Sequence, residues 1–377
     1  MSVARTYLDH NASAPLRPAA REAVVAALDV FGNASSVHGE GRRARALVDE
    51  AREAVAQLVN ARPAEVVFTS GATEANVWAL SQPWERIAVA NVEHDSIRAP
   101  AAQVAAARGR PVVALPVAQD GAVDVAAAED GHGVKGPGLL IALQMANNET
   151  GIVQDVARAG LWATGHGARI HCDAVQAPGR IPIDFPTLGV TTLSLSAHKM
   201  GGPKGVGALV VSGNTPLAPL IAGGGQEMRR RAGTENVAAI AGFGAAARAA
   251  LDDLKSTSRV AALRDRLEAD VLRMTPHAVV IGAGSRRLPN TSSIAVEGVS
   301  AETLIIKFDL MGVAVSAGSA CSSGKVGAST VLSAMGLAPE IARGAIRVSL
   351  GPETTEDDIA AFLAAWRKIH GGASLAA

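Results

Sequence analysis

The chain has 377 residues, enough for two or three domains, and apolar residues make up 48% of it, enough for a buried core. Its 35 basic and 35 acidic side chains cancel, so no overall charge would attract nucleic acid or an anionic membrane surface. Aromatic residues amount to only 3%, too few for the stacking surfaces of single-strand binders. The sequence shows neither a signal peptide nor an apolar run long enough to span a membrane, so we expect a cytoplasmic protein.

The chain contains two cysteines, Cys172 and Cys321. Two cysteines cannot build a disulfide framework or a cysteine-rich zinc site. Each is therefore either a buried core residue or a thiol that takes part in chemistry. We expect no bound metal.

Up to residue 211, helical segments alternate with short apolar runs. Apolar residues at helical spacing predict helices over 17–31 and 41–60. Seven runs rich in aliphatic and β-branched residues predict strands at 65–70, 86–91, 111–117, 139–146, 169–175, 191–197 and 206–211. Nearly continuous apolar strands with helix-sized spacers indicate a largely buried α/β sheet.

The rest of the chain predicts a smaller α/β unit. A long helical region covers 234–274, and a further helix is expected near 301–311. Strands are predicted at 278–284, 291–299 and 313–318, with helices at the C-terminal end. No long linker separates the two parts, so we expect them to pack closely.

Polar side chains follow five of the predicted strands. In an open α/β sheet, ligands bind beyond the carboxyl ends of the strands, so these groups could converge. They are Gly71 to Thr73, His94, Asn147 to Glu149, Asp173 with Gln176, and His198 with Lys199.

One end of this set suits a phosphate. A helix is expected to begin at the glycine turn of residues 71–73, so the N–H groups there, including that of Ala72, can bind an anion, and Thr73 adds a hydroxyl. Ser196 and His198 stand after another strand and can add further hydrogen bonds.

The other end suits an aromatic ring with a basic nitrogen and an aldehyde, and pyridoxal phosphate combines these parts. Asp173 would keep the pyridine nitrogen protonated, so that the ring can accept electrons. Lys199 would supply the amine that binds the aldehyde. His94 would stack on the ring, and Asn148 and Gln176 would reach its hydroxyl. Each residue alone also has an ordinary structural explanation, such as a helix cap, and only their order along the chain favours the cofactor.

At this point the sequence resembles the cysteine desulfurases of the NifS/IscS type, within the class V aminotransferase-like enzymes that use pyridoxal phosphate. The resemblance covers nearly the whole chain. It rests on ten motifs: "YLDHNASAP" (7–15), "FGNASSVHGEGR" (31–42), "VVFTSGATEAN" (66–76), "VEHDSI" (92–97), "NNETGIVQDV" (147–156), "HCDAVQAPGRIPID" (171–184), "SLSAHKMGGPKGVGAL" (194–209), "GGGQEMRRRAGTEN" (223–236), "SAGSACSSG" (316–324) and "IRVSLGPETTEDDI" (346–359).

The resemblance implies fold type I of the pyridoxal-phosphate enzymes. A large domain, 16–258, would carry a seven-stranded, mixed and mostly parallel sheet, and a small domain would combine 1–15 with 259–377. It also implies a homodimer, in which Thr234 reaches the cofactor of the neighbouring subunit.

The resemblance further implies residue roles and an activity. Lys199 would hold the cofactor, Cys321 would take sulfur from L-cysteine as a persulfide, and His94 would handle protons. Arg347 would bind the substrate carboxylate, with Asn33 near it. The products would be L-alanine and sulfur for an iron–sulfur scaffold or a sulfur-carrier protein, which serves the synthesis of iron–sulfur clusters or other thio-cofactors.

Two features depart from the family pattern. Cys172 stands where the family more often has valine, and we interpret it as a small buried residue without chemistry. Three consecutive arginines, 229–231, predict a solvated basic turn, although one of them could line the site entrance.

Three other functions compete with this one. A selenocysteine lyase or a small-amino-acid aminotransferase of the same fold would keep the cofactor residues but would not need Cys321. A non-catalytic homologue should lack at least one of Lys199, Asp173, His94 and Cys321. A nucleotide enzyme is suggested by "IGAGSRR" (281–287), a short match without the third glycine of the dinucleotide motif.

Overall fold

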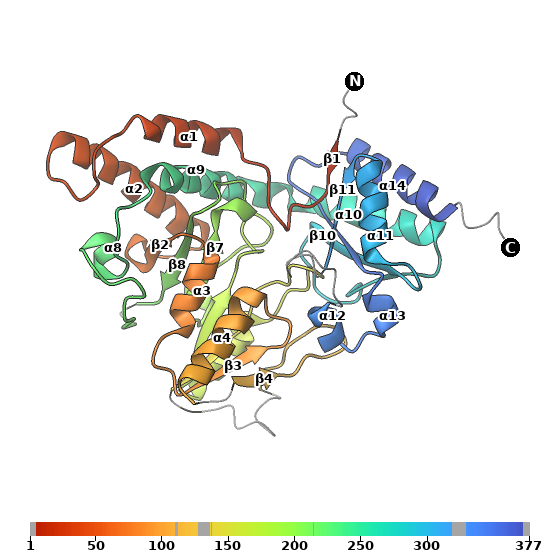
Figure 1. Ribbon diagram of the computed structural model, residues 1–377, viewed down its shortest axis with the longest axis horizontal. Helices are drawn as coiled ribbons and strands as arrows, with labels where there is room; N and C mark the ends of the chain where they lie inside the picture. The colour runs from red at the N-terminus through yellow and green to blue at the C-terminus, as the bar shows by residue number, and fades with distance from the viewer. Residues whose placement is uncertain are drawn as a thin grey trace.

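The computed structural model describes residues 5–109, 112–126, 136, 138–213, 215–318 and 329–371. A seven-stranded sheet runs through its larger part (Figure 1). Across the sheet the order is β2 (Val66–Thr69), β8 (Gly207–Val211), β7 (Thr192–Ser196), β6 (Arg169–Asp173), β5 (Leu139–Ala142), β3 (Arg86–Ala90) and β4 (Val112–Leu115). β8 is antiparallel to both neighbours, and the remaining pairs are parallel. The mixed, mostly parallel seven-stranded sheet predicted from the sequence is confirmed.

Helices cover both faces of this sheet, which explains why its strands are nearly continuous in apolar residues. Neighbouring residues of one strand belong to cores on opposite faces. Phe68 packs with the helices of one face, and Val67 packs against the other face. The first face carries α1 (Pro18–Leu28), α2 (Gly39–Leu58), α6 (Val156–Gly165) and α9 (Val237–Asp253), and the second carries α3 (Ala72–Leu80) and α4 (Asp95–Ala107).

A second core lies to the right of the sheet in Figure 1. In it, the rings of Phe308 and Phe362 stack with their centroids 4.9 Å apart. The chain start joins this core, because β1 (Thr6–Tyr7) pairs with β11 (Val313–Ala314) and Leu8 is fully buried there. An antiparallel sheet of β12 (Ser316–Ala317), β13 (Ile346–Ser349), β10 (Thr291–Val296) and β9 (Ala278–Val280) packs with α10 (Thr257–Met274), α11 (Ala301–Leu310) and α14 (Glu356–Gly371).

Short helices occupy several connections. They are α7 (Phe185–Leu188), α8 (Gln226–Arg229), α12 (Thr330–Ala334) and α13 (Pro339–Ala342), with 3₁₀ turns η1 (Pro63–Glu65), η2 (Ala197–Lys199) and η3 (Leu254–Ser256). Within the described ranges, no helix combines the length and apolar character needed to cross a membrane.

The structure refines two predictions and contradicts a third. The helical region 234–274 is two helices, α9 and α10, joined by η3. The strand predicted at 313–318 divides between two sheets, as β11 and β12. The glycine motif at 281–287 is a turn between antiparallel β9 and β10, not a strand followed by a helix, so the nucleotide-binding interpretation is wrong. The exact division into 16–258 and 1–15 with 259–377 stays a prediction.

Candidate functional site

The ends of five strands bring the candidate residues to one edge of the large sheet. Thr69 of β2 and Ser196 of β7 both pair with Gly207 of β8, so β2 and β7 end level with each other. β6, β5 and β3 run parallel to β7 and end at the same edge. Asp173 ends β6, and the segments that leave the other strands carry Asn148, His94 and Lys199.

The first turn of α3 forms an open end at this edge. The first N–H groups of a helix have no intrahelical partners, and the N-cap Gly71 offers no side chain to accept from them. Thr73 is exposed and Ala72 is partly exposed. The start of α3 lies close to β8, because a Cβ on Gly207 would come within 2.7 Å of the Gly71 backbone. A helix start of this kind can serve as an anion cradle, as predicted for residues 71–73.

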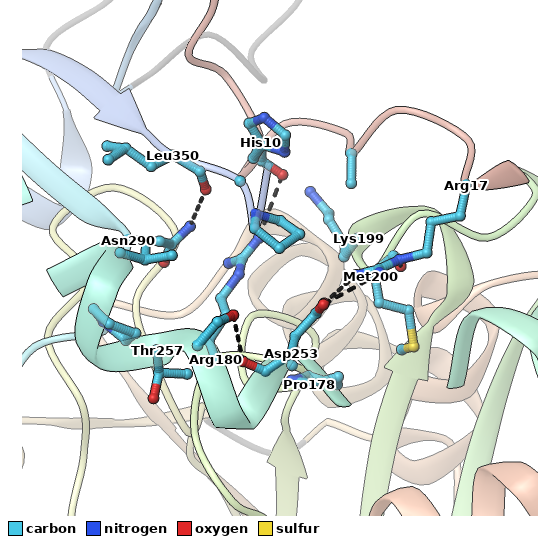
Figure 2. A pocket seen from close by; sticks show the side chains of 17 residues that line it. His10, Arg17, Pro178, Arg180, Lys199, Met200, Asp253, Thr257, Asn290 and Leu350 are labelled. Atoms are coloured by element: carbon cyan, nitrogen blue, oxygen red, sulfur yellow. Dashed lines mark hydrogen bonds and ion pairs between the residues drawn. The ribbon is translucent and has the colours of Figure 1, made fainter. Parts of the chain in front are cut away.

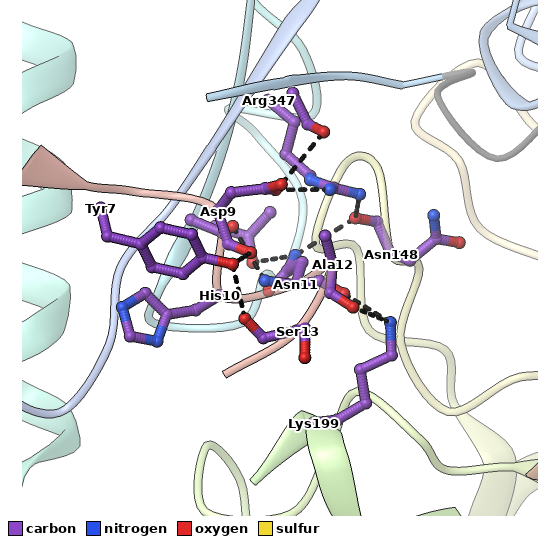
Figure 3. Close-up of polar contacts among 12 residues, drawn as sticks. Tyr7, Asp9, His10, Asn11, Ala12, Ser13, Asn148, Lys199 and Arg347 are labelled. Atoms are coloured by element: carbon purple, nitrogen blue, oxygen red, sulfur yellow. Dashed lines mark hydrogen bonds and ion pairs between the residues drawn. The ribbon is translucent and has the colours of Figure 1, made fainter. Parts of the chain in front are cut away.

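Lys199 stands at the end of η2, directly after β7. Its Nζ donates to the carbonyl oxygens of Asn11 at 2.6 Å and Ala12 at 3.0 Å, from the N-terminal segment (Figure 3). Beside it, Nδ1 of His198 lies 3.2 Å from Oγ of Ser13. Burial and the charges of nearby lysines lower the pKa of His198 to about 4, so this ring is neutral at pH 7.

Asp173 is the last residue of β6, and only 8% of the residue is exposed. Oδ1 accepts from the N–H of Val175 at 3.0 Å, and Oδ2 accepts from Nδ2 of Asn76 at 3.0 Å. Two donors therefore orient a buried acceptor, as a partner for a protonated ring nitrogen requires.

His94 is the N-cap of α4 and is half-buried. Its Nδ1 accepts from the N–H of Ser96 at 3.1 Å and lies 2.9 Å from the Ser96 hydroxyl oxygen. The ring is held at the edge of the sheet by the start of its own helix.

Arg347 lies in β13 and is 4% exposed. Figure 3 shows its guanidinium between two partners, with Nη2 donating to Oδ1 of Asp9 at 2.8 Å and Nη1 donating to the carbonyl of Asn148 at 3.0 Å. Nε is buried and has no hydrogen-bond acceptor among the described residues. Two of the five N–H donors of the guanidinium are thus used within the chain.

The two amides expected at the cofactor hydroxyl are placed differently. Asn148 is partly exposed, and its carbonyl accepts from Arg347 and from Nδ2 of Asn11 at 3.2 Å. Gln176 donates to the Asn11 carbonyl at 3.1 Å and accepts from Arg180. Their contacts with a cofactor stay predictions.

A small pocket lies below the N-terminal segment (Figure 2). His10, Arg180 and Lys199 line it, and Arg17 pairs with Asp253 at its rim. Its volume is about 40 Å³, room for a few waters and not for a cofactor. Its lining residues come from segments other than α3, so it is separate from the start of that helix.

Two predicted site residues, Cys321 and Asn33, are not placed at this edge by the described residues, whereas Thr234 lies beside the end of β2. Cys321 lies outside the described residues. Thr234 is exposed and lines a cavity of about 220 Å³ with Ser70. Asn33 is exposed in the loop between α1 and α2, where it accepts from the N–H of Ser35 at 2.8 Å. In Figure 1 that loop lies at the far left, away from β10, the partner of the strand that carries Arg347.

The two departures from the family pattern have different outcomes. Cys172 is fully buried in β6, as expected, and burial raises the pKa of its thiol well above the usual value. The prediction of a solvated turn is wrong for Arg231, which pairs with Glu74 of α3 at 2.9 Å and is half-buried. The pair ties the arginine segment to the helix that forms the cradle.

Sequence reasoning missed Asp9, Asn11, Asn76 and Ser96. Asp9 and Asn11 belong to the motif "YLDHNASAP", which contributed to the resemblance but was given no role in the site. Asn76 follows Thr73 by three residues, and that spacing places the two on one side of a helix. Which polar group each side chain meets depends on the packing of distant segments.

The residues present fit pyridoxal phosphate. The cradle at α3 is open, since nothing lies within 4 Å of a Cβ built on Gly71. The same edge offers the amine of Lys199, the oriented carboxylate of Asp173 and the imidazole of His94. This cofactor needs an anion site, an amine and a buried acceptor for a protonated nitrogen, and this edge of the sheet offers all three.

Known proteins similar to this chain belong to a family that uses this cofactor. The family model described as aminotransferase class-V matches residues 6–362. The chain is 38% identical to an IscS-like cysteine desulfurase of Mycobacterium tuberculosis, over 95% of this chain and 94% of the relative. It is 40% identical to the cysteine desulfurase IscS of Dictyoglomus turgidum, over 94% of this chain and 91% of the relative. The crystal structure of a NifS-like protein from Rickettsia africae superposes with a TM-score of 0.87 at 34% identity, covering 97% of this chain and 99% of that one.

Proposed function

Because the chain belongs to the class V aminotransferase family and, within it, to the cysteine desulfurases of the IscS/NifS type, we propose that it converts L-cysteine to L-alanine with pyridoxal phosphate. The family resemblance carried by the sequence motifs is thereby confirmed. The sulfur would be held on Cys321 as a persulfide and passed to an acceptor protein for the synthesis of iron–sulfur clusters or other thio-cofactors.

One observation carries this proposal. The amine of Lys199, the oriented carboxylate of Asp173 and the open start of α3 lie at one edge of one sheet. A non-catalytic homologue would have no need to keep all three.

The residues that would hold the cofactor follow from this geometry. The first turn of α3 with Thr73, and Ser196 and His198 after β7, would bind the phosphate. Asp173 would hold the proton of the ring nitrogen, and Lys199 would hold the aldehyde carbon. When bound, the cofactor supplies an aldehyde for the substrate amine and a conjugated ring that accepts electrons.

The chain's own residues then act on the substrate. Arg347 binds the cysteine carboxylate through a charge-assisted contact, and Lys199 moves the proton of Cα. The Cys321 thiolate attacks the substrate sulfur, so that an S–S bond forms and the Cβ–S bond breaks. The electron pair left on the carbon side takes up a proton, and the products are alanine and the Cys321 persulfide. His94, at the mouth of the same edge, handles a proton of the substrate.

The dimer belongs to the proposal as well. Phe31 is 85% exposed and Val37 is 88% exposed in the loop between α1 and α2, and a second copy of the chain would cover them. Thr234 would then reach the partner's phosphate, and Asn33 would approach the partner's substrate site. A sulfur acceptor, either an iron–sulfur scaffold or a carrier protein, would meet this dimer in the cytoplasm.

The test is the release of alanine and sulfide from L-cysteine with a reductant, by the wild type and by Cys321→Ala, both loaded with pyridoxal phosphate. We expect both products from the wild type and neither from the variant. Cys172→Val is the matched control, because that buried thiol should be dispensable. A variant that makes alanine at the wild-type rate would refute the role of Cys321 and favour the selenocysteine lyase or aminotransferase alternative.

A further inference from the structure

A buried asparagine on α3 joins the two side chains that would meet the cofactor ring. Asn76 has no exposed surface. Its Nδ2 donates to Oδ2 of Asp173 at 3.0 Å and to Oγ of Ser96 at 2.9 Å, while its Oδ1 lies 2.9 Å from Nε2 of His171. Ser96 in turn contacts Nδ1 of His94. All three hydrogen-bonding groups of the amide are therefore used.

The direction of each hydrogen bond in this network is determined by its ends. An ionised carboxylate can only accept, so Asp173 requires that the nitrogen of the Asn76 amide faces it. The oxygen of the amide then faces His171, which must donate from Nε2. The Nδ1 of His171 lies 2.8 Å from the Thr192 hydroxyl and accepts from it. Burial lowers the pKa of His171 to about 4, so the ring is neutral, as this arrangement requires.

The other branch of the network determines the tautomer of His94. Oγ of Ser96 accepts one proton of the Asn76 amide, so the Ser96 hydroxyl has its own proton left for Nδ1 of His94. The backbone N–H of Ser96 points to the same nitrogen and can only donate. Nδ1 of His94 therefore carries no proton, and the neutral ring carries its proton on Nε2.

We propose that Asn76 is a positioning residue for the cofactor ring: its amide holds Asp173 in place directly and holds His94 in one tautomer and orientation through Ser96. This inference rests on the proposed function only for the identity of the cofactor. A single side chain thus aligns the carboxylate that would hold the proton of the ring nitrogen with the imidazole that would contact the ring. A small apolar residue at position 76 would leave Asp173 with one donor.

The first test is titration of pyridoxal phosphate into the full chain freed of cofactor, followed by absorbance. Asn76→Ala should weaken binding about ten- to hundredfold, the effect of losing a hydrogen bond to a charged group. Asn76→Asp keeps the shape but replaces the donor with a second carboxylate beside Asp173, so it should bind at least as weakly. If Asn76 only fills space, Asn76→Asp binds like the wild type, and that result would overturn the proposal.

The second test reads histidine tautomers by ¹⁵N NMR, which needs neither cofactor nor turnover. We expect His94 and His171 to carry their proton on Nε2. His166 is an internal control with the opposite tautomer, because its Nδ1 faces the carbonyl of Trp162 at 2.7 Å. In Asn76→Asp, the Ser96 hydroxyl should turn to the new carboxylate.

In this variant the Nδ1 signal of His94 should therefore shift, while an unchanged His166 signal shows that the fold is retained. A His94 signal identical in both proteins, or a proton on its Nδ1 in the wild type, would overturn the proposal. An inactive wild type with these signals as expected would refute the desulfurase function alone, because the network belongs to the chain itself.

Discussion

The buried imidazole of His171 should make the folded chain sensitive to acid. It is completely buried in β6, and burial lowers its pKa from 6.5 to about 4. Between pH 4 and pH 6.5, the imidazole is therefore protonated in the unfolded chain and neutral in the folded chain. The contribution to stability is fully present above pH 6.5 and is lost as the pH falls towards 4.

The size of this effect follows from the shift. At pH 5 the ring is protonated in most unfolded chains and in few folded ones, which costs about 2 kcal/mol of unfolding free energy, against almost nothing at pH 7. His171→Asn removes the titrating group. It also lowers stability at both pH values through the lost contacts with Thr192 and Asn76, and that part cancels in the comparison.

The assay is urea-induced unfolding of the wild type and the variant at pH 7 and pH 5. We expect the wild type to lose about 2 kcal/mol more than the variant between these pH values. Other buried histidines, such as His198, titrate in both proteins and do not affect the difference. Equal losses in the two proteins would refute the reasoning. His171→Gln repeats the test if the first variant folds poorly.

Three further predictions concern the cradle, the substrate and the fold. Gly207→Ala places a methyl group within 2.7 Å of the backbone at the start of α3. This variant should therefore bind pyridoxal phosphate at least tenfold more weakly in the titration. The control is Gly284→Ala, whose new methyl group has nothing within 4 Å, and it should bind as the wild type does. Arg347→Lys keeps the charge but loses the planar fork, so the KM for L-cysteine should rise about ten- to hundredfold in steady-state assays; an unchanged KM would exclude Arg347 from substrate binding. Arg52→Ala leaves the buried carboxylate of Glu227 without its bidentate partner at 2.7 Å. The free energy of unfolding measured in urea should therefore fall by about 3–5 kcal/mol. A fall of less than about 1 kcal/mol would contradict this expectation.

The sheet was predictable because its signal is local. Apart from the edge strand β4, where Ala114 is exposed, the strands are buried on both faces, so their apolar runs are nearly continuous and can be recognised without knowledge of their neighbours. The long region 234–274 shows the limit, since η3 joins two helices without a proline or glycine in it to mark the junction. The division of 313–318 between two sheets also depends on partners far away in the chain, Tyr7 and Arg347.

The candidate site was predictable to the extent that strand ends determine it. Asp173 ends its strand, and Lys199 and His94 stand within four residues of a strand end, so the sheet alone brings the three to one edge. The contacts between them depend on packing. Asp9 and Asn11 of the N-terminal segment contact Arg347 and Lys199 from more than a hundred residues away, and neither has a sequence signal that reveals such a contact.

In the proposed reaction, the sulfur of L-cysteine is transferred to Cys321. The most direct measurement is the mass of the cysteine-bearing peptides after the holoenzyme reacts with L-cysteine in the absence of reductant. We expect one added sulfur atom on the peptide with Cys321 and none on the peptide with Cys172, whose thiol is fully buried. Formation of alanine while the Cys321 peptide gains no sulfur would contradict it.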